Sequence, residues 1–188
     1  IKALPQEMNQ AINRTIEHLQ TESATVTIQN AEVAAGKLDL NVAVANLGGH
    51  KLPTAYPSRR SWLHVAVRDR NGRVVFESGA LQKDGSIRGN DNDEDASKFE
   101  PHHTDITSPD QVQVYESVMA GADGSLTTGL LTALRFVKDN RLLPKGFDKR
   151  TATPDIAVHG EAETDADFVA GGDRVHYSVA LGDAQGPF

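Results

Sequence analysis

The feature that most constrains the fold is an alternation of large apolar side chains with polar or small ones, clearest in KLDLNVAVAN at residues 37–46. Every second position of this segment carries a branched apolar residue: Leu38, Leu40, Val42 and Val44. A period of two places such side chains on one face of a β-strand. Ala35-Gly36 separates this segment from a second alternating run, residues 24–33, and the pair predicts a β-hairpin.

The same period recurs as far as the C-terminus. Further alternating runs occupy residues 61–69, 73–79, 111–119 and 173–181. Asn71-Gly72 lies between the first two of these runs and is a strong hairpin signal. Residues 128–139 fit either a helix or a strand by periodicity, and we favour a strand because the neighbouring segments are strands.

Apart from the ambiguous residues 128–139, only the N-terminal segment has a helical period. Met8, Ile12 and Ile16 recur every four residues, and Pro5 stands where a helix would begin. The whole pattern predicts an all-β chain, an antiparallel β-sandwich of immunoglobulin-like or related type, preceded by one α-helix. We expect residues 1–22 to form this helix and to link to an upstream domain of a longer protein. Residues 23–188 would form the sandwich, with a long acidic loop at 82–110.

Composition narrows the function classes. The net charge of -7 argues against a nucleic acid or an anionic membrane surface as partner. No apolar run approaches the roughly 20 residues that a membrane helix needs, so we expect no membrane insertion. The absence of cysteine excludes disulfides, thiolate nucleophiles and covalent attachment of haem within these residues.

The connection at residues 46–60, NLGGHKLPTAYPSRR, concentrates polar chemistry between two strands. Its glycine pair permits close backbone approach and its two prolines stiffen the chain. We therefore expect a rigid turn to present His50, with Arg59 and Arg60 flanking the next strand. A neutral imidazole can ligate a metal, and an arginine pair can bind carboxylates such as haem propionates. The alternative is that these side chains make only local hydrogen bonds and ion pairs.

The acidic loop contains a second candidate site. Asp91, Asp93 and Asp95 place oxygen ligands at i, i+2 and i+4, as a calcium loop requires. An EF-hand would need glycine and glutamate at the sixth and twelfth positions, where this chain has Ala96 and His102. Two hypotheses remain open here: a calcium site of another type, and a solvated acidic loop.

The sequence carries few motifs that are typical of catalytic sites. Glu100, His102 and His103 could contribute to a metal site, but adjacent residues of an extended chain point to opposite faces. No HExxH or GxSxG spacing occurs, so we do not expect the isolated chain to be an enzyme. Asp165 and Asp167, before Phe168, could contribute to a cation site or lie in a solvated turn, and we favour the turn.

GHKLPTAYPSRRSWLHVAVRDRNGRVVFESG, residues 49–79, resembles a segment of bacterial multihaem c-type cytochromes, where it occurs in a β-sandwich region beside the haem-binding part. FEPHHTDITSPDQVQVYESVM and VKDNRLLPKGFD resemble further parts of that region. The resemblance spans most of the chain from about Ala24.

This resemblance implies a secreted electron-transfer protein, periplasmic or extracellular, whose haem c is bound by a domain outside these residues. His50 would then lie near a haem or serve as an axial ligand, and the partners would be that haem-bearing domain and a redox partner protein. A calcium-stabilised extracellular β-sandwich binding module is the alternative function.

Overall fold

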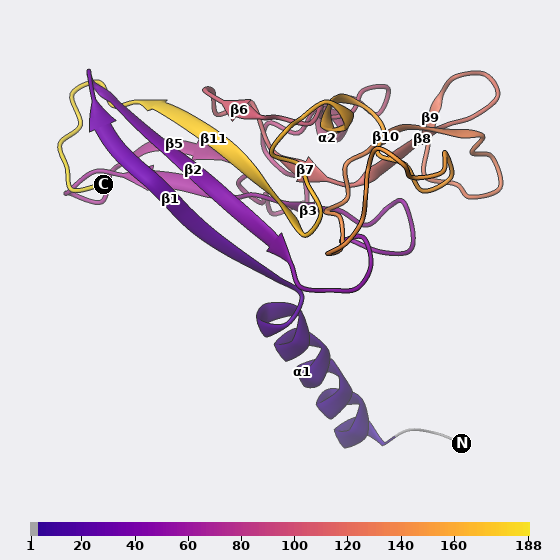
Figure 1. Cartoon of the computed structure of the whole chain (residues 1–188). Helices are drawn as coiled ribbons and strands as arrows, with labels where there is room; N and C mark the ends of the chain where they lie inside the picture. Colours follow the sequence, from indigo (N-terminus) through magenta and orange to yellow (C-terminus); the bar gives the residue numbers. More distant parts are fainter. Residues whose placement is uncertain (1–3) are drawn as a thin grey trace.

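A computed structural model describes residues 4–188, which form a β-rich body preceded by one helix (Figure 1). The helices are α1 (Pro5–Thr21), the single turn α2 (Asp91–Glu94) and the 3-10 turn η1 (Glu161–Glu163). The strands are β1 (Ala24–Ala34), β2 (Lys37–Asn46), β3 (Ser61–Trp62), β4 (Val65–Arg68), β5 (Val74–Ser78), β6 (Asp105–Ile106), β7 (Val114–Tyr115), β8 (Ser117–Ala120), β9 (Leu126–Thr127), β10 (Arg135–Asp139) and β11 (Gly172–Ala180).

The largest sheet has the strand order β1-β2-β11-β6. The β1–β2 and β2–β11 pairs are antiparallel, and β6 is parallel to β11. Ala35 and Gly36 close the β1–β2 hairpin with φ values of 50° and 76°, the left-handed pair that a two-residue hairpin turn requires. The alternating apolar residues of β2 are all buried, which confirms the period read from the sequence.

The other sheets are small: β10-β8-β9, β3-β7 and β4-β5. The β4–β5 hairpin turns at Gly72, as predicted, with a φ of 80°. The alternating runs at 61–69 and 111–119 are each divided into two short strands. In the ambiguous segment only residues 135–139 form a strand, and residues 128–134 form neither helix nor strand.

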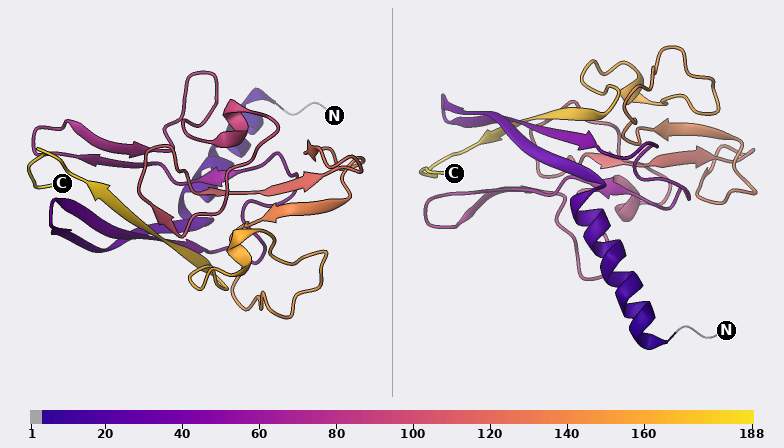
Figure 2. Two further views of the ribbon diagram at one scale, coloured as in Figure 1. Left: turned by 90° about the horizontal axis from the view of Figure 1, so that it is seen from above. Right: turned by 60° about the horizontal axis from the view of Figure 1, so that its bottom comes forward.

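The main core lies between the large sheet and the β4–β5 hairpin, which Figure 2 shows as separate layers. Phe76 of β5 meets Tyr177 of β11 edge to face, with ring centroids 6.3 Å apart. A smaller cluster of Ile87, Val112 and Val114 packs against Trp62. The structure confirms a β-rich fold with one N-terminal helix, while the sandwich type stays a prediction because the sheets are short and separate.

Helix α1 extends away from this body (Figures 1 and 2), and none of its residues is buried. Strand β1, to which it leads, is also exposed along almost its whole length. Among residues 4–188 no helix is both long and apolar enough to cross a membrane.

Candidate functional site

The corner at residues 46–51 is fixed by the buried side chain of Asn46, the last residue of β2. Its Nδ2 donates to the carbonyls of His50, at 2.8 Å, and Leu142, at 3.0 Å. Its Oδ1 accepts the Gly48 N–H at 2.9 Å. One amide thus satisfies three backbone groups and ties the glycine turn to the segment after β10.

Lys51 provides a second anchor for this corner. Its Nζ lies 2.7 Å from Oδ2 of Asp139, a fully buried residue, and 3.1 Å from the Ala157 carbonyl. Arg141 forms a bidentate ion pair with the same carboxylate. Burial lowers the pKa of Lys51, and the charge of Asp139 opposes that shift. The lysine therefore holds the corner in place against β10.

His50 lies on the outside of this fixed corner, and its side chain is exposed. Its Nδ1 is 3.1 Å from the carbonyl oxygen of Lys51. Because a carbonyl only accepts hydrogen bonds, Nδ1 carries the proton, and in the neutral ring Nε2 has a free lone pair. Within residues 4–188 no side chain or backbone group bonds to this Nε2. The corner thus presents the Nε2 atom of His50 to solvent.

The two arginines do not act as a pair. Arg59 is exposed, and among residues 4–188 its guanidinium donates only to the Thr54 carbonyl, at 3.3 Å. Arg60 instead forms a half-buried ion pair with Asp93, with Nη1 and Oδ1 2.7 Å apart. The structure therefore joins one residue of the predicted arginine site to one residue of the predicted calcium site.

Two of the three predicted calcium ligands, Asp93 and Asp95, bond to separate groups of this chain. Asp93 also accepts the Ile87 N–H at 2.7 Å. Burial acts to raise the pKa of Asp93, but the bonds from Arg60 and Ile87 outweigh burial, so the pKa is lowered. Asp95 accepts the N–H and hydroxyl of Ser97. Asp91 begins the helical turn α2, in which a two-residue spacing does not align side chains. Among the described residues these aspartates form no cluster able to hold a cation.

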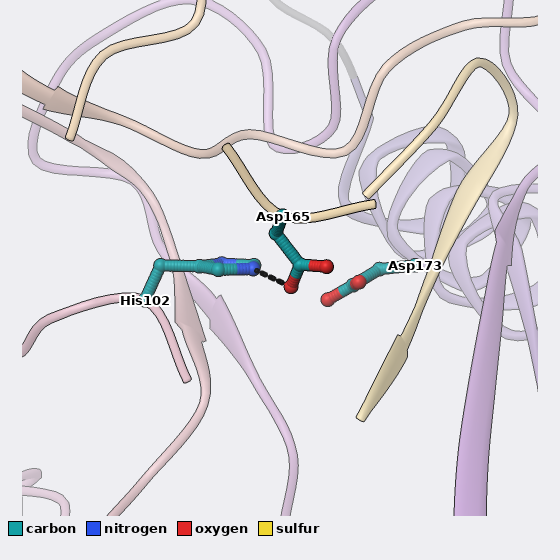
Figure 3. A group of neighbouring side chains, drawn as sticks. All are labelled: His102, Asp165 and Asp173. Carbon is teal, nitrogen blue, oxygen red and sulfur yellow. Dashed lines mark hydrogen bonds and ion pairs between the residues drawn. The ribbon is translucent and has the colours of Figure 1, made fainter. Parts of the chain in front are cut away.

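The structure reveals a different cluster, His102, Asp165 and Asp173 (Figure 3), whose ligand atoms all lie within 4.8 Å of one another. The Nε2 of His102 is 3.0 Å from Oδ2 of Asp165, and all three residues are buried. Asp165 was predicted to lie in a solvated turn, which is wrong: 7% of it is exposed, because the loop that carries it folds over His102. His103 turns the other way and binds Glu100, as expected for adjacent residues.

Two amides fix the protonation state of the His102 ring. Gln113 Nε2 and Asn140 Nδ2 lie 2.8 and 3.1 Å from its Nδ1. Neither amide can be reversed: Gln113 Oε1 accepts the His103 N–H, and Asn140 Oδ1 accepts the Glu116 N–H. Both therefore donate to Nδ1, which must be unprotonated. The neutral ring carries its proton on Nε2 and donates it to Asp165.

The pKa values of the cluster follow from this arrangement. Burial lowers the pKa of His102, although the nearby Asp173 and Asp165 oppose the shift. Burial raises the pKa of Asp173, whose Oδ2 accepts from Tyr115 at 2.8 Å and from Gln113 at 3.1 Å. Burial also acts to raise the pKa of Asp165. Bonds from the Asp167 N–H, Thr104 and His102 outweigh burial, so the pKa of Asp165 is lowered.

The chemistry open to this cluster is limited. Metal binding through Nε2 would move the ring proton to Nδ1, where it would face two N–H donors. Thr104 donates its hydroxyl proton to Asp165 at 2.9 Å and not to the ring. These bonds join segments that are far apart in the chain.

Comparison with known proteins gave no assignment: no family model, no curated protein and no solved structure matches this chain.

Proposed function

We propose that this chain is a noncatalytic β-sandwich domain of a secreted multihaem c-type cytochrome, and that it packs against a haem-bearing domain outside these residues. The observation that carries the proposal is the state of His50. Its ring stands on a corner held by Asn46 and Lys51, donates from Nδ1 to a carbonyl, and leaves Nε2 free in solvent. Histidines that ligate metals in proteins have their second nitrogen fixed in this way.

The residues present fit a haem bound by a neighbouring domain and not one attached here. Without cysteine the chain forms no thioether bond to haem, so it offers a ligand and not an attachment site. When bound, haem supplies the electron transfer, and the protein controls ligation, burial and nearby charge. Arg59, which has no carboxylate partner among residues 4–188, is the guanidinium available to a propionate.

A noncatalytic role is supported by the way the polar interior is used. The His102 ring, Asp165 and Asp173 already bond to groups of this chain, and among the described residues neither nitrogen of the ring bonds to a hydroxyl. The secreted location, the redox partner and the cytochrome family rest on the resemblance of residues 49–79.

The first test is to read the parent gene on both sides of this segment. We expect CxxCH motifs, and their absence would overturn the proposal. In the parent protein we then compare His50→Ala with His18→Ala, a matched change of an exposed histidine on α1. Visible absorption and electron paramagnetic resonance report the spin state of each haem.

If His50 is an axial ligand, His50→Ala converts one haem from low spin to high spin, and His18→Ala leaves all spectra unchanged. If His50 only contacts a haem, the spin states persist and one reduction potential shifts. Identical spectra and potentials in the two variants would contradict any haem-directed role of His50.

A further inference from the structure

We propose that one side of α1 and the adjoining face of β1 form the surface on which the haem-bearing domain docks. This inference rests on the proposed function and adds the location of the contact. We call it the α1–β1 surface, and it consists of Leu4, Met8, Ile12, Ile16, Leu19, Val26, Ile28 and Val33.

The helical part of this surface is an apolar stripe without a partner. Leu4, Met8, Ile12, Ile16 and Leu19 recur at spacings of four and three residues, which places them on one side of the helix. Their exposed fractions range from 48% to 63%. Isolated helices of this length are marginal in water, and most helices in proteins are stabilised by packing of their apolar face. The stripe of α1 has no such packing within residues 4–188.

The strand part is an uncovered continuation of the core face. Val26 and Ile28 pair with Val44 and Val42 of β2, so their side chains lie on the same side of the sheet. The β2 partners are 6% and 2% exposed, whereas Val26 and Ile28 are 59% and 69% exposed. Val33, opposite the buried Leu38, repeats the contrast. The layer that covers β2 therefore does not reach β1.

The area of this surface matches one protein–protein interface. A large aliphatic side chain carries roughly 100 Å² of apolar surface, so eight such side chains about half exposed present on the order of 400 to 500 Å². A standard interface buries about 800 Å² on each partner, of which somewhat more than half is apolar. A folded domain is therefore an occupant of suitable size.

Position and charge favour the haem-bearing domain over a second copy of this chain. The Leu47 N–H donates to the Ser23 carbonyl at 3.1 Å, so the corner that presents His50 is tied to the junction of α1 and β1. A partner that meets His50 thus lies beside the α1–β1 surface. Residues 4–34 contain four glutamates and a single arginine, which favours a partner with a basic rim and disfavours self-association.

Thiol labelling is a direct test, because this chain has no cysteine and the CxxCH cysteines expected in the parent would be bonded to haem. We introduce Met8→Cys on the stripe and Gln10→Cys on the opposite side of α1, since two residues correspond to 200° of rotation. Val26→Cys and Thr27→Cys form the equivalent pair on the two faces of β1. Labelling rates with a maleimide are measured in the haem-loaded parent and in the 188-residue chain.

We expect the thiols at positions 8 and 26 to react at least tenfold more slowly than those at positions 10 and 27 in the parent, and at similar rates in the 188-residue chain. Equal rates in a parent that carries CxxCH motifs would overturn the inference and leave the proposed function standing. Protection in the 188-residue chain that grows with its concentration would assign the surface to a second copy and also overturn the inference. A parent without CxxCH motifs would remove the proposed function itself.

Discussion

The polar interior around His102 and the α1–β1 surface differ in whether their side chains find partners within this chain. In the first, the ring and the two aspartates bond to groups of this same chain. In the second, eight large apolar side chains have no covering layer among residues 4–188. Buried polar groups are costly unless every partner is present, whereas an exposed apolar stripe gains stability only from contact. The ring and carboxylates of the cluster are thus bonded within the chain, whereas the apolar side chains of the α1–β1 surface are uncovered among residues 4–188.

The largest effect is expected from the buried ion pair beside the His102 cluster. Lys138 is fully buried, and its Nζ lies 3.0 Å from Glu116 Oε1. Glu116→Ala would leave this ammonium without its counter-charge and should cost about 3 to 5 kcal/mol of unfolding free energy in urea. Combining Lys138→Met with Glu116→Gln should recover most of that loss. A loss below about 1 kcal/mol for Glu116→Ala would show that the interior does not depend on complete pairing.

His102 should make stability depend on pH. Its pKa is lower in the folded chain, so the unfolded chain binds the proton more readily. Its contribution is therefore fully present above the unfolded pKa of about 6.5 and decreases as the pH falls below it, by at most about 1.4 kcal/mol per pH unit.

Urea unfolding at pH 7, 6 and 5 should show this loss, and His102→Gln should remove most of it. Asp173, whose pKa is raised, acts with the opposite sign, because its contribution is lost as the pH rises through its folded pKa. The same measurement on His18→Gln, a change of an exposed histidine on α1, is the control. A slope in His102→Gln equal to that of the unsubstituted chain would contradict the lowered pKa of His102.

Two buried tyrosines sharpen the contrast between paired and unpaired groups. The hydroxyl of Tyr115 donates to Asp173 at 2.8 Å, whereas the buried hydroxyl of Tyr177 has no partner among the described residues. Tyr115→Phe should therefore destabilise the chain by about 1 to 2 kcal/mol, and Tyr177→Phe should be neutral or stabilise it by up to about 1 kcal/mol. Thermal unfolding of both variants measures this difference, and a destabilisation of equal size in both would refute it.

The smallest effect is expected on α1. Ile12→Ser removes a large apolar side chain that is 52% exposed, so the free energy of unfolding of the 188-residue chain should change by no more than about 0.5 kcal/mol. Val175→Ser, a matched change at a fully buried position of β11, should cost several times more. Comparable losses in the two variants would mean that α1 packs within this chain.

Local features of the fold were predictable from the sequence, because hairpin turns and a two-residue period are written in neighbouring residues. The β1–β2 and β4–β5 hairpins and the burial of alternate residues in β2 all follow from such patterns. The division of residues 61–69 and 111–119 into short strands could not be predicted in this way, because it depends on which distant segment each half pairs with. The exposure of the α1 stripe was also not predictable from the sequence, because periodicity predicts that a helix has an apolar side but not what covers that side.

The candidate sites also differ in how far they could be predicted from neighbouring residues. The rigid corner and exposed ring of His50 follow from a glycine turn and stiffening residues within a few positions. The contact of His102 with Asp165 spans 63 positions and has no local signature. Asp173 offered one clue: it is in phase with Val175 and Tyr177, and an acid on the inward side of a strand indicates a buried partner. The pairing of Arg60 with Asp93 likewise joined two motifs that appeared separate.

Hydrogen exchange of the 188-residue chain alone tests most directly whether β2 and β11 are stable within this chain while α1 depends on a partner. Protection factors for amides of α1 are compared with those of β2 and β11, measured by mass spectrometry at neutral pH. The account predicts α1 amides within about tenfold of the unprotected rate and strand amides protected by several orders of magnitude more. Protection of α1 equal to that of β2 would show that the helix is stabilised by this chain itself and would contradict the account.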